Sequence, residues 1–123
     1  MNRKLLVAST LLAFIGTMLL GNAYYAEYRL SPERYSVAAL ELTPLGTTAV
    51  EAIITIEEQF GPAYRHRRCL NEPMSSTNFS YSAQAASHWL APIPVIYYIY
   101  VYWCFDESGV LENIEAVKVG DGL

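Results

Sequence analysis

VIYYIYVYWCF, DESG and VLENIEAVKV, read without a break from Val95 to Val119, form the stretch that decides the fold. The first segment, Val95–Phe105, consists almost wholly of β-branched and aromatic residues, which suit a pleated, half-buried strand. The next four residues, which end in Gly109, have the composition of a turn. A second apolar segment then returns, so the stretch predicts a β-hairpin.

Alternation along the first strand predicts two faces of different character. The inward face is expected to carry Val95, Tyr97, Ile99, Val101, Trp103 and Phe105. The other face carries Ile96, Tyr98, Tyr100, Tyr102 and Cys104. A membrane helix over Leu90–Phe105 is disfavoured, because the segment is too short and contains two prolines.

The register of the hairpin depends on its turn. We favour a type I turn with Gly109 as the left-handed residue, which pairs Asp106 with Val110 and Phe105 with Leu111. That register places Ile99 opposite Val117 and directs two polar residues inward, Asn113 and Glu115. A four-residue loop would instead direct inward Val110, Ile114 and Ala116.

A helix is predicted from Thr48 to Phe60. Thr48 and Glu51 form a capping box, Gly61 suits the C-terminal cap, and Pro62 prevents continuation. Apolar residues recur at helical spacing, and we expect three of them to pack on the hairpin: Val50, Ile54 and Phe60.

Three further segments are less regular. Ser31 and Pro32 begin a short helix to about Leu40, with Val37 and Leu40 on one face. Ala63–Leu70 is expected to be a strand, with Tyr64, His66 and Arg68 on one face and Arg65, Arg67 and Cys69 on the other. Phe79–Leu90 is compatible with strand or helix, and Ala91–Pro94 is expected to be extended.

The N-terminus has the layout of an export signal. Arg3 and Lys4 precede a 16-residue apolar stretch without a charge, and small residues then allow cleavage after Ala23. An uncleaved anchor helix is the alternative, and both interpretations place the rest of the chain outside the cytoplasm. The expected organisation is a signal or anchor over 1–23, a linker with a short helix over 24–43 and an α+β domain over 44–123. The expected location is the periplasm or the outer side of the inner membrane.

Charge excludes some partners. The chain has eight basic and twelve acidic residues, and two of the basic residues lie in the first 23 positions. The remainder therefore carries a formal charge of −6, which disfavours binding to nucleic acid or to anionic lipid surfaces. Membrane contact is expected only through residues 1–23, if they remain attached.

Two cysteines and two histidines are the candidate groups for covalent or metal chemistry. Cys69 and Cys104 are expected to form a disulfide that closes a loop of about 36 residues and stabilises the fold by roughly 4 kcal/mol. Two unpaired thiols on different faces are the alternative. His66 and His88 lack the close ligand pairs of a zinc site, so no metal is predicted.

Arg65, Arg67 and Arg68 form the basic cluster of the chain, together with His66. The cluster can contact an anion or an acidic partner, or it can simply protect an edge strand from aggregation. No nucleophile elbow and no glycine-rich phosphate loop is present. The sequence therefore predicts no enzyme activity and no cofactor.

Three motifs together resemble a known family. They are Leu45–Glu51 (LGTTAVE), Gln59–Pro62 (QFGP) and Cys104–Val110 (CFDESGV). The chain resembles the SmpA/OmlA (BamE-like) family of small bacterial envelope domains over roughly Pro44 to Val119. The resemblance implies two short helices packed on an antiparallel sheet of about three strands, and a non-catalytic scaffold role in envelope protein assembly. Family members are typically lipoproteins, whereas no cysteine follows the apolar segment here.

Two functions are carried forward. In the first, Tyr98, Tyr100 and Tyr102 form a surface that binds another envelope protein, because aromatic residues are enriched at interface cores. The alternative for these tyrosines is packing under the short N-terminal helix. In the second function, a pocket bounded by Trp89, Trp103 and the tyrosines holds a small ligand.

Overall fold

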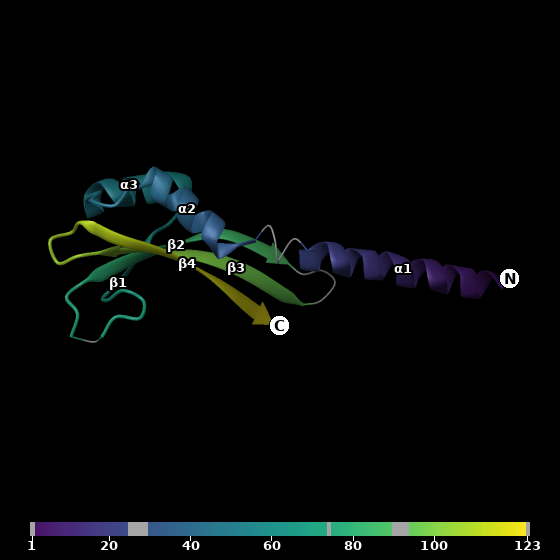
Figure 1. Ribbon diagram of the computed structural model, residues 1–123. Helices are drawn as coiled ribbons and strands as arrows, with labels where there is room; N and C mark the ends of the chain where they lie inside the picture. Colours follow the sequence, from purple (N-terminus) through teal and green to yellow (C-terminus); the bar gives the residue numbers. More distant parts are fainter. Residues whose placement is uncertain (1, 25–29, 74, 90–93, 123) are drawn as a thin grey trace.

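The predicted hairpin forms the centre and one edge of an antiparallel sheet. The computed structural model describes residues 2–24, 30–73, 75–89 and 94–122. Its elements are α1 (Arg3–Tyr24), α2 (Pro32–Leu42), α3 (Ala49–Gln59), β1 (Tyr64–His66), β2 (Phe79–Trp89), β3 (Val95–Phe105) and β4 (Leu111–Gly122). The strand order is β1-β2-β3-β4. Helices α2 and α3 lie on one face of the sheet, and α1 extends away from it (Figure 1).

The α+β class is confirmed, but the expected number of strands is wrong. The sheet has four antiparallel strands where about three were expected. The short strand β1 pairs with only three residues of β2, from Ser80 to Ser82. The remainder of the strand expected over Ala63–Leu70 leaves the sheet after His66 and turns at Leu70 and Asn71.

The turn of the hairpin has the predicted bulged form. Gly109 adopts a φ of +84°, and its N–H donates to the Asp106 carbonyl at 2.9 Å. The Asp106 N–H donates to the Val110 carbonyl at 2.9 Å, which closes the predicted pair. Phe105 lies opposite Leu111, also as predicted.

A bulge immediately after the turn changes the rest of the register. Phe105 pairs with Leu111, but Cys104 pairs with Asn113, so Glu112 is the extra residue of β4. Ile99 therefore lies opposite Lys118, and the expected pairing with Val117 is wrong. The bulge reverses the alternation, which brings Ile114 and Ala116 to the core and turns outward the two polar residues Asn113 and Glu115.

The limits of α3 are those predicted. The Thr48 hydroxyl accepts a hydrogen bond from the Glu51 N–H at 3.5 Å, and Gly61 follows the helix with a φ of +96°. The predicted packing face is wrong in part, because Val50 is 72% exposed and Ile54 is 56% exposed. Ala52 and Ile56 are buried instead.

Helix α2 also packs through a small residue. It runs beyond Leu40 to Leu42, and Ala39 is its buried residue, whereas Val37 and Leu40 are exposed. The Ser31 hydroxyl donates to the Glu33 carboxylate at 2.7 Å and caps no backbone N–H. Because Ala39 belongs to the core cluster, α2 is part of the folded domain.

The core combines large side chains on the sheet with small ones on the helices. Trp103 and Phe105 are fully buried beneath Ala39 and Ala52, which allow the helices to approach closely. The Trp103 indole N–H donates to the Thr43 hydroxyl at 3.0 Å. That hydroxyl donates in turn to the Ala39 carbonyl at 2.6 Å, so the polar groups in this contact are satisfied.

The ambiguous segment after Asn78 is a strand. β2 runs from Phe79 to Trp89 and pairs along its length with β3, with an irregularity between Gln84 and Ala86. Ala83 is buried under the helices, so the alanines serve close packing and not helix formation. The extended segment expected at Ala91–Ile93 and the start of the expected linker, residues 25–29, lie outside the described residues.

Helix α1 matches the expected signal or anchor. The stretch Arg3–Gly21 is long and apolar enough to cross a membrane, and none of it is buried against the domain. A cleaved signal sequence and a retained anchor share these properties.

Candidate functional site

The face of the sheet opposite α2 and α3 carries the predicted tyrosine row, which consists of Tyr98, Tyr100 and Tyr102. All three are half-buried, and the rings of Tyr98 and Tyr100 lie 6.0 Å apart. None of the three belongs to the core cluster, which α2 and α3 cover from the other side. The tyrosine row therefore does not pack under the helices, and we call this side of the sheet the open face.

The neighbours of the tyrosine row differ between its two sides. On the β2 side, Tyr102 pairs with Ser82 and Tyr100 pairs with Gln84. On the β4 side, Tyr102 pairs with Glu115 and Tyr100 pairs with Val117. The row thus lies between small polar side chains on one strand and a mixed apolar and acidic strand on the other.

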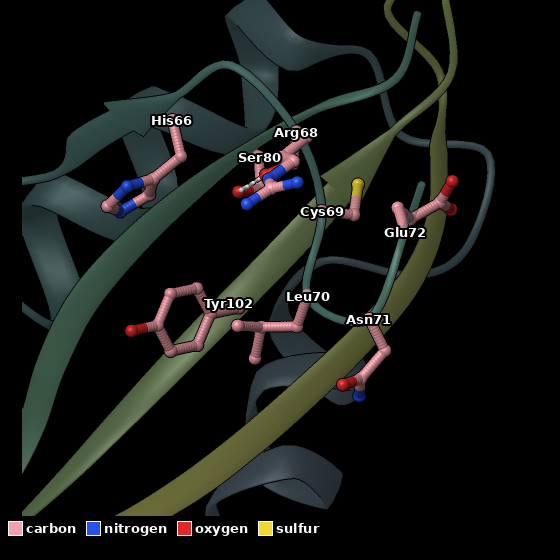
Figure 2. A pocket seen from close by; sticks show the side chains of 8 residues that line it. All are labelled: His66, Arg68, Cys69, Leu70, Asn71, Glu72, Ser80 and Tyr102. Atoms are coloured by element: carbon pink, nitrogen blue, oxygen red, sulfur yellow. Dashed lines mark hydrogen bonds between the residues drawn. The ribbon is translucent and has the colours of Figure 1, made fainter. Parts of the chain in front are cut away.

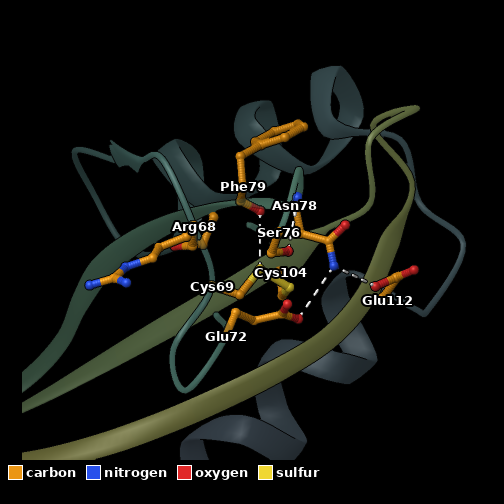
Figure 3. Close-up of a disulfide and its surroundings, with 9 residues drawn as sticks. Arg68, Cys69, Glu72, Ser76, Asn78, Phe79, Cys104 and Glu112 are labelled. Carbon is orange, nitrogen blue, oxygen red and sulfur yellow. Dashed lines mark hydrogen bonds between the residues drawn. A yellow bond between two sulfur atoms is a disulfide. The ribbon is translucent and has the colours of Figure 1, made fainter. Parts of the chain in front are cut away.

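The predicted disulfide is confirmed, and it shapes one end of the open face. Cys69 is bonded to Cys104, with 5.5 Å between their Cα atoms. Cys104 points from β3 to the open face, so the bond holds the loop after β1 over that end of the sheet (Figure 3). The Asn78 side-chain amide donates to the carboxylates of Glu72 and Glu112 at 3.3 Å each, which fastens the same loop to β4.

The loop and the sheet line a half-open cavity of about 380 Å³. Figure 2 shows His66, Arg68 and Tyr102 toward one end of it, and Asn71 and Glu72 toward the other. Its remaining lining residues are Cys69, Leu70 and Ser80. Since Tyr102 belongs to both, this loop cavity is continuous with the tyrosine row.

A second cavity, of about 440 Å³, lies where α3 leads into β1. Phe60, Pro62 and Tyr64 line it on one side and Tyr100 on the other. Neither cavity is lined by Trp89 or Trp103. Trp103 is fully buried in the core under the helices, so the expected pocket between the two tryptophans and the tyrosines is wrong.

The basic cluster is divided by the fold. Arg65 lies over the Phe79 ring, 4.7 Å from its centroid. All three arginines are exposed, and Arg68 is the one that lines the loop cavity. Among the described residues, no carboxylate pairs with Arg67 or Arg68.

His66 and Ser82 are within hydrogen-bond distance of each other on the open face. The His66 Nε2 and the Ser82 hydroxyl are 2.7 Å apart, and the His66 ring lies 5.7 Å from the Tyr102 ring. Nucleophilic catalysis also requires a group that orients the imidazole. Within the described ranges, no carboxylate is hydrogen-bonded to His66.

The cysteines and histidines considered as zinc ligands do not come together among the described residues. The described residues bring together Cys69, Glu72 and Cys104, whose ligand atoms lie within 4.8 Å of one another, without His66 or His88. Both sulfurs are joined in the disulfide, so neither offers a thiolate to a metal ion.

The clear pKa shifts of the described residues lie away from the open face. Hydrogen bonds from the Val110 N–H and the Ser108 hydroxyl hold the pKa of Asp106 below its ordinary value. A hydrogen bond from the Ser31 hydroxyl lowers the pKa of Glu33. Both carboxyls serve local structure, one in the hairpin turn and one at the start of α2.

Sequence reasoning missed the residues that complete the loop cavity, which are Leu70, Asn71, Glu72 and Ser80. A signal for one of them was present, because Asn71 precedes Glu-Pro and asparagine tolerates the left-handed conformation of turns. Asn71 indeed has a φ of +61°. Comparison of the chain with family models, with curated proteins and with solved structures finds no match. The likeness to the BamE-like family therefore rests on the three sequence motifs alone.

Proposed function

We propose that this chain is a non-enzymatic envelope domain that binds another envelope protein through the open face of its sheet. It acts in the periplasm, or at the outer side of the inner membrane if α1 is retained as an anchor. One observation carries the proposal: three half-buried tyrosines stand in a row on the side of the sheet that the helices leave uncovered.

The chemistry of the tyrosine row supports a protein partner. A tyrosine ring offers apolar area with few rotatable bonds, and its hydroxyl tolerates water before binding and a hydrogen bond after it. The cavities beside Tyr100 and Tyr102 can receive side chains of a partner. The scaffold role in envelope assembly is the one implied by the BamE-like resemblance, and the disulfide suits an oxidising compartment.

Site-specific photo-crosslinking in intact cells tests the proposal. A photoreactive phenylalanine derivative at position 100 is expected to trap one defined protein. The matched control places the same photoreactive residue at position 54. Ile54 is also an apolar surface residue, 56% exposed, but it lies on the outer side of α3. Replacement of all three tyrosines by serine is expected to reduce partner capture at least about tenfold while the circular dichroism spectrum is retained.

Two outcomes would contradict the proposal. Equal crosslinking from positions 54 and 100 would place the partner on the helices or show non-specific contact. Loss of folding in the serine variant would show that the tyrosines support the core. The first outcome would mean that the partner does not bind the open face. The second would mean that the tyrosines have a structural role and not a binding role.

A small-ligand role is the second candidate, favoured by the volumes of the two cavities. Both exceed about 300 Å³, the lower end of the range for ligand pockets. Native mass spectrometry of the protein released from membranes distinguishes the candidates. A retained small molecule that disappears in a Tyr100→Ser variant would favour the ligand role, whereas a retained protein subunit would favour the scaffold role.

A further inference from the structure

The outer edge of β2 is covered over only part of its length. β1 pairs with three residues of β2, from Ser80 to Ser82, whereas β2 itself continues to Trp89. Among the described residues, no strand and no loop backbone is hydrogen-bonded to this edge from Ala83 to Ser87, and we call this stretch the free edge. Its backbone N–H and C=O groups therefore offer hydrogen bonds to an additional strand.

The free edge lacks the side chains that protect sheet edges. Natural edge strands carry charged residues or prolines, which hinder unwanted pairing. The sequence of the free edge is AQAAS, without a charge or a proline. By contrast, β4 at the opposite edge of the sheet has four charged residues, which are Glu112, Glu115, Lys118 and Asp121. The start of β4 is also covered, because Leu111 exchanges backbone hydrogen bonds with Gly46 and Thr47, so β2 offers the less protected edge.

The cavity of about 440 Å³ lies at the point where the free edge begins. Residues from both faces of the sheet line it, so it is situated at the edge itself. Ala83 belongs to the core cluster under the helices, and Ser82, Gln84 and Tyr100 lie on the open face. The remaining lining residues are Phe60, Pro62 and Tyr64. None of these residues is charged, so the cavity suits an apolar side chain better than an acidic or basic one.

We propose that the free edge of β2 receives an extended segment of the partner protein as an additional strand, with one bulky apolar side chain of that segment in the cavity beside Tyr100. The inference rests on the proposed function, and it adds the conformation of the partner. Tyr100 connects the two, because it belongs to the tyrosine row and also lines the cavity.

The unpaired edge selects an extended backbone as its occupant. A helix pairs its own N–H and C=O groups internally, whereas an extended segment has groups available for the edge of a sheet. The small side chains of the free edge also let another strand approach closely. The irregularity between Gln84 and Ala86 limits regular pairing to a few residues, so the added strand is expected to be short.

The test uses the full chain in nanodiscs of zwitterionic phosphatidylcholine. The probe is a short neutral peptide of alternating threonine and valine with a central phenylalanine, acetylated and amidated at its ends. Amide hydrogen exchange of the chain is measured by NMR. With the peptide at ten times its dissociation constant, exchange is expected to slow about tenfold at Ala83–Ser87 and to stay unchanged on β4. Absence of this protection, or protection of β4 instead, would overturn the inference.

Two kinds of altered peptide separate backbone pairing from side-chain contact. N-methylation of alternate residues removes the N–H donors along one edge of the peptide. Methylation of one edge is expected to weaken binding roughly tenfold, whereas methylation of the other edge is expected to have little effect. Replacement of the phenylalanine by alanine is also expected to weaken binding roughly tenfold, because the cavity is then unfilled. Equal binding of all these peptides would contradict strand addition.

A variant of the chain with Gln84→Lys and Ser87→Lys places two charges on the free edge, and it is expected to bind the peptide roughly fivefold more weakly. The matched control has Asn113→Lys and Val119→Lys, because these exposed residues lie on β4 at the opposite edge. Unchanged binding by the first variant, or equal losses in both, would overturn the inference. Slow exchange at Ala83–Ser87 that appears without peptide as the protein concentration rises would also overturn it, because a second copy of the chain would then occupy the edge.

The outcome is separable from that of the proposed function. A partner crosslinked at position 100 whose capture is unaffected by Gln84→Lys and Ser87→Lys would leave the proposed function standing and overturn the strand-addition inference. Absence of any partner at position 100 would remove the proposed function itself.

Discussion

At the scale of single residues, Thr43 joins the helical layer to the sheet. It lies at the end of α2 and is buried, and it accepts the indole N–H of Trp103 while it donates to Ala39. A buried polar group that loses its hydrogen-bond partner destabilises the folded state, because its loss of contact with water is no longer compensated. Thr43 is therefore expected to matter more to stability than its size suggests.

Thr43→Val is expected to lower the free energy of unfolding by about 1–3 kcal/mol, because the Trp103 N–H then has no acceptor. Urea denaturation followed by tryptophan fluorescence measures the change. The control is Thr55→Val, since the Thr55 hydroxyl bonds only to the Glu51 carbonyl of its own helix. Equal losses in the two variants would show that the bond to Trp103 carries no special weight.

The carboxylate of Asp106 supports the hairpin turn in a pH-dependent way. Hydrogen bonds from Val110 and Ser108 hold its pKa below the ordinary value of 3.8, so the ionised form is favoured in the folded state. The stability that it contributes is fully present above that ordinary value and is lost as the pH falls through the lower folded pKa. The contribution is therefore confined to acidic solutions.

Asp106→Asn is expected to lose less stability than the unmodified protein when the pH is lowered from about 5 to about 2. Urea unfolding at a series of pH values gives the two curves. The lowered pKa of Glu33 affects both proteins, so its contribution cancels in the difference. Parallel curves would contradict the assignment of this effect to the turn.

At the scale of elements, the bulge in β4 decides which residues reach the core. Leu111 and Ile114 both face inward although they are three positions apart, because Glu112 is the extra residue between them. Deletion of Glu112 is therefore expected to preserve both faces of β4 and cooperative unfolding. Deletion of Glu115 removes a residue without a bulge to absorb the change, and it is expected to abolish cooperative unfolding. Thermal unfolding followed by near-UV circular dichroism distinguishes the two, and a folded Glu115 deletion would show that the register of β4 is loosely specified.

The disulfide connects two elements that share no strand pairing. Replacement of both Cys69 and Cys104 by alanine is expected to lower the free energy of unfolding by about 4 kcal/mol, because the open chain gains entropy when unfolded. Denaturant titration of the double variant measures the loss. The strands that carry the tyrosine row pair without help from the disulfide. The far-UV circular dichroism spectrum of the double variant is therefore expected to persist in mild conditions. A loss under about 1 kcal/mol would indicate that the loop is already restrained in the unfolded chain.

The elements that could be predicted are those with local signals. The limits of α3 follow from Thr48, Gly61 and Pro62, and the face of the tyrosine row follows from simple alternation in β3. The packing face of α3 could not be predicted, because Val50 and Ile54 make one side as apolar as the side with Ala52 and Ile56. Ala52 and Ile56 share the core cluster with Trp103, a contact that the sequence of the helix alone does not reveal.

The candidate site was predictable in its tyrosines but not in its cavity. The loop cavity depends on a chain reversal at Asn71 and on a bond between residues 35 positions apart. The bulge at Glu112 could not be predicted either. The bulged turn accounts for the inward Leu111, the four-residue loop accounts for the inward Ile114 and Ala116, and neither accounts for both. β2 was ambiguous because its alanines favour a helix locally, whereas pairing with β3 favours a strand.

At the scale of the whole molecule, the domain and α1 are separate bodies of different character. The stretch Arg3–Gly21 is apolar and unburied, and the core cluster begins with α2. A chain without residues 1–23 is expected to keep its unfolding midpoint within about 2 °C and to remain in the supernatant after ultracentrifugation with vesicles. The full chain is expected to sediment with them. A large drop in the midpoint would show that α1 stabilises the domain.

The bond between Cys69 and Cys104 also divides folding into a stage before oxidation and a stage after it. Hydrogen bonds from Ser80 and Asn78 can hold the loop after β1 on the sheet while the cysteines are reduced, and oxidation adds a covalent restraint. In a reducing environment the sheet can thus form before the loop cavity has its covalent restraint.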